Sequence, residues 1–208
     1  MPEGLQRRTK KAAPAPKKRA SSDPEALVGV YQIKVSLRDA APAIWRRLLV
    51  PASVTLADLH EIIQRAMGWE NYHLHAFDVG GVRFGVPDPD LELRDDRKVR
   101  LRDVARAEGA EFAYEYDFGD GWEHDIIVEK ILDDPVTRPA LVAGERACPP
   151  EDCGGIFGYA HLLEVLADPQ HEEYEELSNW IGDKFDPDAL DVDGINRRLA
   201  KMRLGPRS

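Results

Sequence analysis

Two aspartates and a histidine lie within the nine-residue segment YDFGDGWEH, residues 116–124. Asp117, Asp120 and His124 supply the carboxylates and imidazole that proteins use for acid–base catalysis and for oxygen/nitrogen ligation of divalent metals. The same segment places a glycine on each side of Asp120, which is typical of a tight turn between two strands. The residue types therefore predict a turn and leave open whether the turn also carries chemistry.

Histidines at alternating positions give a second candidate for metal binding. His73 and His75 lie two residues apart on an expected strand, so both side chains point to one face of the sheet. Such spacing can present two imidazoles to one metal ion, although strand histidines are also common structural groups. Together with Asp117, His124 and Asp152, they are the candidate ligands of a divalent metal such as zinc, manganese or iron.

The segment ACPPEDCGG, residues 147–155, is the third candidate and is called the PPED loop below. Its two prolines stiffen the backbone and its two final glycines permit close approach to another segment, so Glu151 and Asp152 are displayed between them. The C-x4-C spacing does not match a zinc knuckle, and two reduced structural cysteines are expected. The candidate catalytic residues of the chain are therefore Asp117, Asp120, His124, Glu151 and Asp152.

The periodicity of apolar residues predicts an α+β fold. Strands are expected at 31–37, 44–50, 111–118 and 122–132, a hairpin at 73–85, and helices at 56–67, 157–167, 171–182 and 193–203. Thr55 and Asp58 form a capping-box pattern at the start of the first helix, and Gly68 ends it. The order of elements favours a β-grasp-like mixed sheet with one packed helix, followed by a C-terminal α-helical appendage.

Three regions are expected along the chain. Residues 1–27 form a disordered basic tail, residues 28–145 the β-grasp-like core, and residues 146–205 the PPED loop with the helical appendage packed on the core. Residues 1–20 carry seven Lys and Arg against one Glu, a net charge of +6, so the remainder of this chain of net charge −10 carries −16. The acidic body disfavours conventional nucleic-acid binding, whereas the tail allows a weak nucleic-acid contact through residues 1–20.

Composition indicates a soluble protein: 43% of the residues are hydrophobic, 32% are charged, and only two are cysteines. No apolar run approaches the roughly 18 residues of a membrane span, and the N-terminus lacks the apolar core of a secretory signal. A cytoplasmic location without a membrane partner is expected, since few cysteines suit a reducing compartment.

The register of the hairpin around residue 120 decides which groups meet. A two-residue Asp120-Gly121 turn would place Asp117 opposite His124 as an acid–base pair. A three-residue loop, 119–121, places the aromatic residues with His124 on one face and the carboxylates on the other. We favour the second register because the buried face sets the pairing. The repulsion between carboxylates on the acidic face can be offset by water and salt, by arginines of a neighbouring strand such as Arg46 or Arg47, by the basic tail, by a bound cation or by a basic partner.

Six ordered segments carry a resemblance to a known family: IWRRLLVP, TLADLHEIIQRAMGW, HLHAF, YEYDFGDGWEH, CPPEDCGGIFGY and NWIGDKFDPDAL with DGIN after it. Over residues 29–200 the chain resembles the plasmid pRiA4b ORF-3-like family, some members of which carry a transposon-resolvase label. The resemblance implies that Asp117, Asp120, His124, Glu151 and Asp152 are shared within the family as candidate site residues. No recombinase-like serine motif supports the resolvase label.

Three functions are compatible with these features. The first is a non-enzymatic module that binds a protein or small ligand through an acidic and aromatic surface, and it predicts an exposed patch around Trp45, Trp69 or Trp122. The second is a metal-dependent hydrolase or nuclease-like enzyme, which requires at least three candidate ligands around one point. The third is a mobile-element nucleic-acid binder acting through the tail. Nucleotide-binding, serine-hydrolase and zincin motifs are absent from the sequence.

Overall fold

The computed structural model describes residues 29–133, 138–182 and 185–204. Eight strands form one sheet: β1 (Val30–Leu37), β2 (Trp45–Pro51), β3 (His75–Val79), β4 (Val82–Gly85), β5 (Arg94–Asp95), β6 (Glu111–Tyr116), β7 (Trp122–Leu132) and β8 (Ala140–Glu145). The helices are α1 (Leu56–Met67), the 3₁₀ turn η1 (Asp96–Lys98), α2 (Leu101–Val104), α3 (Gly155–Ala167), α4 (Tyr174–Ile181) and α5 (Val192–Ala200). The predicted disordered tail, residues 1–27, lies outside the described residues.

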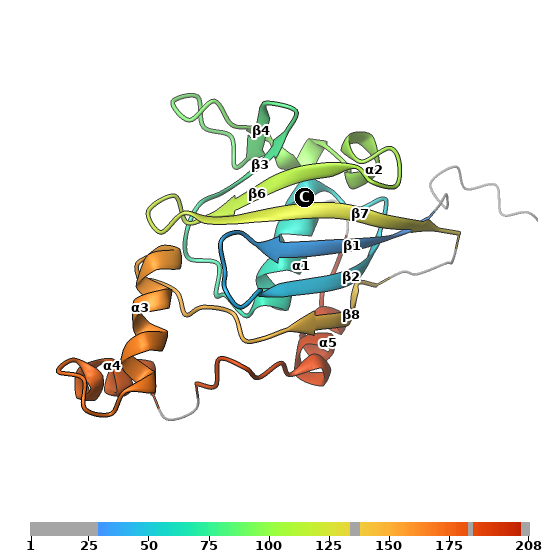
Figure 1. Ribbon diagram of the computed structural model, residues 1–208. Coiled ribbons are helices and arrows are strands. Elements are labelled where there is room, and N and C mark those ends of the chain that lie inside the picture. Colours follow the sequence, from blue (N-terminus) through green and yellow to red (C-terminus); the bar gives the residue numbers. More distant parts are fainter. Residues whose placement is uncertain (1–28, 134–137, 183–184, 205–208) are drawn as a thin grey trace, which may run out of the picture.

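The α+β class predicted from the sequence is confirmed. The strands follow the order β5-β4-β3-β6-β7-β1-β2-β8, and only the β4–β5 pair is parallel, so the sheet is mixed. Figure 1 shows α1 crossing one face of the sheet, α5 beside α1 and β8, and α3 with α4 beyond the end of the sheet where the β6–β7 loop lies. None of the described helices is both long enough and apolar enough to span a bilayer.

The ends of α1 are set by its sequence. The Thr55 hydroxyl accepts a hydrogen bond from the Asp58 amide at 3.0 Å, and the Asp58 carboxylate accepts one from the Thr55 amide at 3.0 Å, so the predicted capping box is present. Gly68 ends the helix with a left-handed φ of 108°. This positive φ turns the chain abruptly, which places the loop after α1 at the edge of the candidate site.

The β6–β7 hairpin presents an aromatic face to the core. Its buried residues are Phe112, Tyr114, Tyr116, Trp122, His124, Ile126 and Val128. The predicted face is therefore correct, but Tyr116 pairs with Trp122, so the loop has five residues (117–121) and not three. The strand ends early because Asp117 takes a left-handed φ of 54°, and consequently the alternative pairing of Asp117 with His124 does not occur either.

The opposite face of the sheet carries the carboxylates, which arginines neutralise. Arg47 forms an ion pair with Glu129 at 2.5 Å, and Arg38 contacts both Glu123 and Asp125. The expectation for Arg47 is thus confirmed, and that side-chain hydrogen bond lowers the pKa of Glu129. Arg46 does not share this role, because it is buried and donates to the backbone carbonyls of Ala66, Trp45 and Glu145.

Two features of the chain were not expected. Strand β8 adds to the edge of the sheet beside β2, although its sequence, ALVAGE, is too short and weakly patterned to predict it. The predicted helix 171–182 begins only at Tyr174, after turns around His171. The expected division of the chain between residues 145 and 146 stays a prediction.

Candidate functional site

His73 lies in the loop between α1 and β3, and the predicted strand begins only at His75. The Tyr116 hydroxyl, on β6, accepts hydrogen bonds from the backbone amides of Tyr72 at 3.0 Å and His73 at 3.4 Å. The Glu70 amide donates to the Glu151 carboxylate at 3.0 Å. These bonds fix the loop backbone at Glu70, Tyr72 and His73, and so they position the residue that carries the imidazole.

Asp117 leaves β6 at the end of the hairpin strand. Its amide donates to the Leu74 carbonyl at 2.9 Å, and its Oδ1 accepts from the Gly119 amide at 3.0 Å. The residue is 8% exposed. The bond to Gly119 occupies one carboxylate oxygen and leaves Oδ2 directed toward His73, at 3.7 Å from Nε2.

Asp152 comes from the PPED loop, which the structure places directly against the hairpin. The Gly154 amide donates to the Asp120 carboxylate at 3.2 Å. The Tyr116 hydroxyl donates to the Glu151 carboxylate, and burial followed by this hydrogen bond raises the pKa of Tyr116 well above its usual range. The phenol therefore stays protonated, and Tyr116 ties the His73 loop and the PPED loop to the same strand.

The contact between the hairpin and the PPED loop depends on Gly155. A Cβ atom at this position would lie 2.3 Å from the Asp120 carbonyl oxygen, and φ is +67°. We expect Gly155→Ala to lower the free energy of unfolding by clearly more than the roughly 1 kcal/mol of left-handed strain alone. Urea unfolding measures this difference.

Gly121→Ala is the matched control, because Gly121 lies in the same hairpin with a similar φ of +66° and open space around its Cβ position. Gly121→Ala is expected to lower the free energy of unfolding by only about 1 kcal/mol. Equal losses in the two variants would contradict the close approach of Gly155 to the hairpin.

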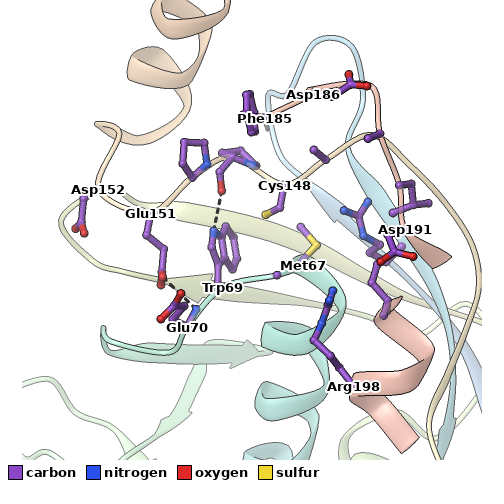
Figure 2. A pocket seen from close by; sticks show the side chains of 18 of the residues that line it. Met67, Trp69, Glu70, Cys148, Glu151, Asp152, Phe185, Asp186, Asp191 and Arg198 are labelled. Carbon is purple, nitrogen blue, oxygen red and sulfur yellow. Dashed lines mark hydrogen bonds between the residues drawn. The ribbon is translucent and has the colours of Figure 1, made fainter. Parts of the chain in front are cut away.

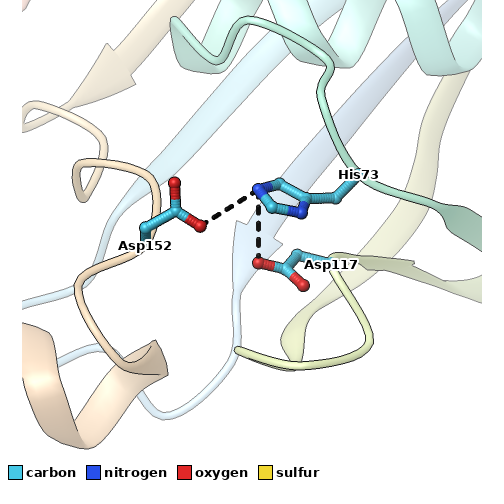
Figure 3. A group of neighbouring side chains, drawn as sticks. All are labelled: His73, Asp117 and Asp152. Carbon is cyan, nitrogen blue, oxygen red and sulfur yellow. Dashed lines mark ion pairs between the residues drawn. The ribbon is translucent and has the colours of Figure 1, made fainter.

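The three side chains converge on one point. His73 Nε2 lies 3.2 Å from Asp152 Oδ1 and 3.7 Å from Asp117 Oδ2, and all three atoms lie within 4.8 Å of one another (Figure 3). Ligand atoms at about 2.1 Å from a tetrahedral metal ion are separated by about 3.4 Å, so this spacing fits metal coordination. We call the group the His73–Asp117–Asp152 cluster.

The imidazole of the cluster lacks an ordinary hydrogen bond. His73 Nε2 is buried and makes no hydrogen bond with the described residues, despite the two nearby carboxylate oxygens. Two adjacent carboxylates repel each other unless a positive charge lies between them. Either a protonated His73 or a metal ion can supply that charge, and the geometry accommodates both.

A model of the plasmid pRiA4b ORF-3-like protein family matches residues 29–194. The chain belongs to this family. Uncharacterized protein y4hQ of Sinorhizobium fredii (strain NBRC 101917 / NGR234) is 40% identical over 178 residues, covering 83% of this chain and 92% of that protein. The crystal structure of MM3350, a protein of unknown function from Methanosarcina mazei Go1, is 41% identical with a TM-score of 0.73, covering 80% of this chain and 97% of that chain.

The family match includes every member of the cluster, so the cluster belongs to the part of the chain that the pRiA4b ORF-3-like model describes. The basic tail precedes residue 29 and lies outside the match. The resemblance predicted from the sequence is thereby confirmed.

The structure separates the other candidate ligands from the cluster. His75 is buried, its Nε2 lies 2.9 Å from Asp96 Oδ2, and its ring stacks on His60 with centroids 3.5 Å apart. His124 is fully buried, and its Nδ1 lies 2.9 Å from the Trp122 carbonyl. Of the five predicted metal ligands, the structure therefore brings together His73, Asp117 and Asp152.

The remaining candidates have structural partners. Asp120 and Glu151 hold the PPED loop in place through the bonds described above. Burial raises the pKa of the Cys148 thiol far above its usual range and raises the pKa of Cys153 to about 12, so both cysteines stay protonated. Neither cysteine belongs to the cluster.

Sequence reasoning missed the role of Tyr116. Its hydroxyl joins three segments, yet in the sequence it is only one of several aromatic residues on a core-facing strand. The signal was its position beside Asp117 at the end of the strand, where a side chain on the buried face can still reach the loops.

Proposed function

We propose that this pRiA4b ORF-3-like protein binds one divalent metal ion through His73 Nε2, Asp117 Oδ2 and Asp152 Oδ1, and that the bound ion serves a hydrolytic reaction. The convergence of three ligand atoms within 4.8 Å carries the proposal. One nitrogen and two carboxylate oxygens suit zinc, manganese or iron. Three protein ligands leave coordination positions for water and substrate.

The surroundings of the cluster support a preorganised site. Each ligand comes from a different segment. The Tyr72 and His73 amides bond to the Tyr116 hydroxyl, and the Tyr116 and Gly154 bonds join the hairpin to the PPED loop, so the three segments are held together. Asp117 is largely buried whereas the Asp152 side chain is 69% exposed, so the cluster is closed on one side and open on the other. A metal ion at such a site lowers the pKa of its bound water and polarises a substrate oxygen.

A binding module without turnover is the second candidate. Asp120 and Glu151 are both engaged in structural hydrogen bonds, and His124 is buried in the core, so none of these three is free to act as a general base. The predicted exposed aromatic patch has little support: Trp69 and Trp122 are buried, at 7% and 1% exposed, and Trp45 is half-buried with Lys34 and Arg47 over its ring. The metal-dependent reaction is therefore preferred, with metal-assisted ligand binding as the alternative.

Two further expectations remain predictions. Nucleic-acid contact through residues 1–20 concerns residues outside those described, and affinity that falls steeply with salt and disappears on removal of the tail would support it. A cytoplasmic location is proposed because Cys148 and Cys153 are free thiols, which suits a reducing compartment.

The decisive experiment is elemental mass spectrometry on untagged protein reconstituted with zinc or manganese and then dialysed. About one ion per chain is expected for the parent, and essentially none for His73→Ala, because a site with two remaining ligands binds weakly. His161→Ala is the matched control, since His161 is exposed and pairs with Glu173 away from the cluster. It should retain the full metal content.

A parent protein that holds no metal after reconstitution would refute the proposal. If metal binds, ester, amide and phosphoester model substrates distinguish the two candidates. Turnover that requires the metal supports the enzyme, and stoichiometric metal without turnover of any class supports the binding module.

A further inference from the structure

A groove of about 620 Å³ adjoins the cluster. It lies between the loop after α1, the PPED loop and the segment before α5 (Figure 2). Asp152 belongs both to the groove lining and to the cluster, so a molecule in the groove lies next to the proposed metal centre. The volume is that of a small-molecule site.

The middle of the groove is apolar and uncharged. Met67, Trp69, Cys148, Phe185, Leu190 and Ile195 contribute to its lining. The Trp69 indole donates to the Pro149 carbonyl at 3.0 Å, which fixes the ring against the PPED loop. The Cys148 thiol is protonated, as its raised pKa requires. This surface favours contact with methylene groups.

Carboxylates lie at both ends of this apolar surface. Figure 2 shows Glu70, Glu151 and Asp152 on one side, and Asp186 and Asp191 on the other. Within the described part of the chain, no cationic side chain forms an ion pair with Glu70 or Asp186. Glu70 accepts a hydrogen bond from the Tyr72 hydroxyl and Asp186 accepts one from the Asp188 amide, so the partners of both carboxylates are neutral groups. Carboxylates without a cationic partner at a groove favour a cationic ligand.

The two arginines in the lining offset only part of this charge. The Arg46 guanidinium is 1% exposed and donates to the carbonyls of Trp45, Ala66 and Glu145. Arg198 donates from Nε to the Arg65 carbonyl at 3.4 Å. The lining thus holds five acidic residues, Glu70, Glu151, Asp152, Asp186 and Asp191, and two arginines, so the carboxylates outnumber the guanidinium groups. Outside the lining, Arg197 lies 3.9 Å from Asp191.

We infer that the groove binds a linear aliphatic diamine or polyamine, with one ammonium group near Glu70, another near Asp186 and Asp191, and the methylene chain over the half-buried Cys148 and Phe185. The inference deepens the proposed function by naming its substrate class, N-acylated polyamines, and the catalytic step rests on that function. Hydrolysis adds water across the amide C–N bond: the acyl carbon gains the hydroxyl and the nitrogen gains the proton, which releases a carboxylic acid and the amine. Binding of the amine itself needs no metal.

Isothermal titration of metal-free protein at physiological salt with spermidine, 1,8-diaminooctane, octylamine and octanedioate tests the binding. Spermidine and 1,8-diaminooctane are expected to bind. Octylamine should bind about tenfold more weakly, because it lacks the second ammonium group and each charge-assisted contact contributes to affinity. Octanedioate, which carries two carboxylates, should not bind. Glu70→Gln and Asp186→Asn should each lower the affinity for 1,8-diaminooctane about tenfold. Asp90→Asn, an exposed aspartate outside the groove lining, should leave binding unchanged.

The outcomes separate the two proposals. Polyamine binding in the parent and in His73→Ala, together with failure to bind metal, would support the groove and refute the metal site. Metal binding without polyamine binding would support the metal site and refute the polyamine groove. Equal polyamine affinity in Glu70→Gln, Asp186→Asn and the parent, or tighter binding of a lysine-containing peptide than of any small amine, would overturn the polyamine assignment.

Discussion

Asp117→Asn is expected to weaken zinc or manganese binding by at least about 100-fold, because it removes both a ligand oxygen and a negative charge. Asparagine can keep the bond from the Gly119 amide through Oδ1, and it tolerates the left-handed φ of 54° at this position. Nδ2 then replaces Oδ2 and cannot ligate the metal. Competition with a chromophoric chelator measures the loss of affinity.

In the absence of metal, the free energy of unfolding of Asp117→Asn should lie within about 1 kcal/mol of the parent's, because removal of one carboxylate also removes its repulsion with Asp152. Thermal unfolding with and without EDTA then gives a metal-dependent shift in the parent alone. Asp120→Asn is the matched control: it lies in the same loop and supports Gly154 without entering the cluster. Equal loss of metal affinity in both variants would point to general loop damage and contradict direct ligation by Asp117.

The part of the fold that was predictable depends on local patterns. The Thr55–Asp58 capping box and the Gly68 terminus set α1 by hydrogen bonds within a few residues, so sequence alone defines them. The aromatic face of the β6–β7 hairpin was equally clear, because alternation with period two separates buried from exposed residues. A register error of two residues leaves that alternation unchanged, which is why the face was correct and the loop length was wrong.

The candidate site was only partly predictable, because its geometry depends on contacts between distant segments. Most strands of the sheet lie between His73 and Asp152 in the sequence. The two residues come together because the PPED loop packs against the turn at Asp120. Nothing in the local pattern shows that docking. In the sequence, His75 and His124 are as plausible ligands as His73. The structure buries both in the core, where they contact neighbouring side chains and not solvent.

The buried imidazole of His124 makes stability dependent on pH. Burial lowers the pKa of His124 to about 4, and its Nε2 has no hydrogen-bond partner among the described residues. In the unfolded chain the pKa is about 6.5, so between pH 6.5 and 4 the unfolded state binds a proton that the folded state does not. Stability is therefore fully present above pH 6.5 and falls as the pH decreases, by roughly 3 kcal/mol at pH 4.

His124→Leu should remove this contribution, because leucine neither titrates nor leaves a polar nitrogen in the apolar space between Trp69 and Tyr114. Urea unfolding of EDTA-treated protein across pH 4 to 7 should then show a smaller loss of stability on acidification, by up to roughly 3 kcal/mol. His161→Gln should keep the parent's slope, since His161 is exposed. Parallel slopes for all three proteins would mean that the folded core accepts the proton on His124, and that this imidazole is less isolated than its burial indicates.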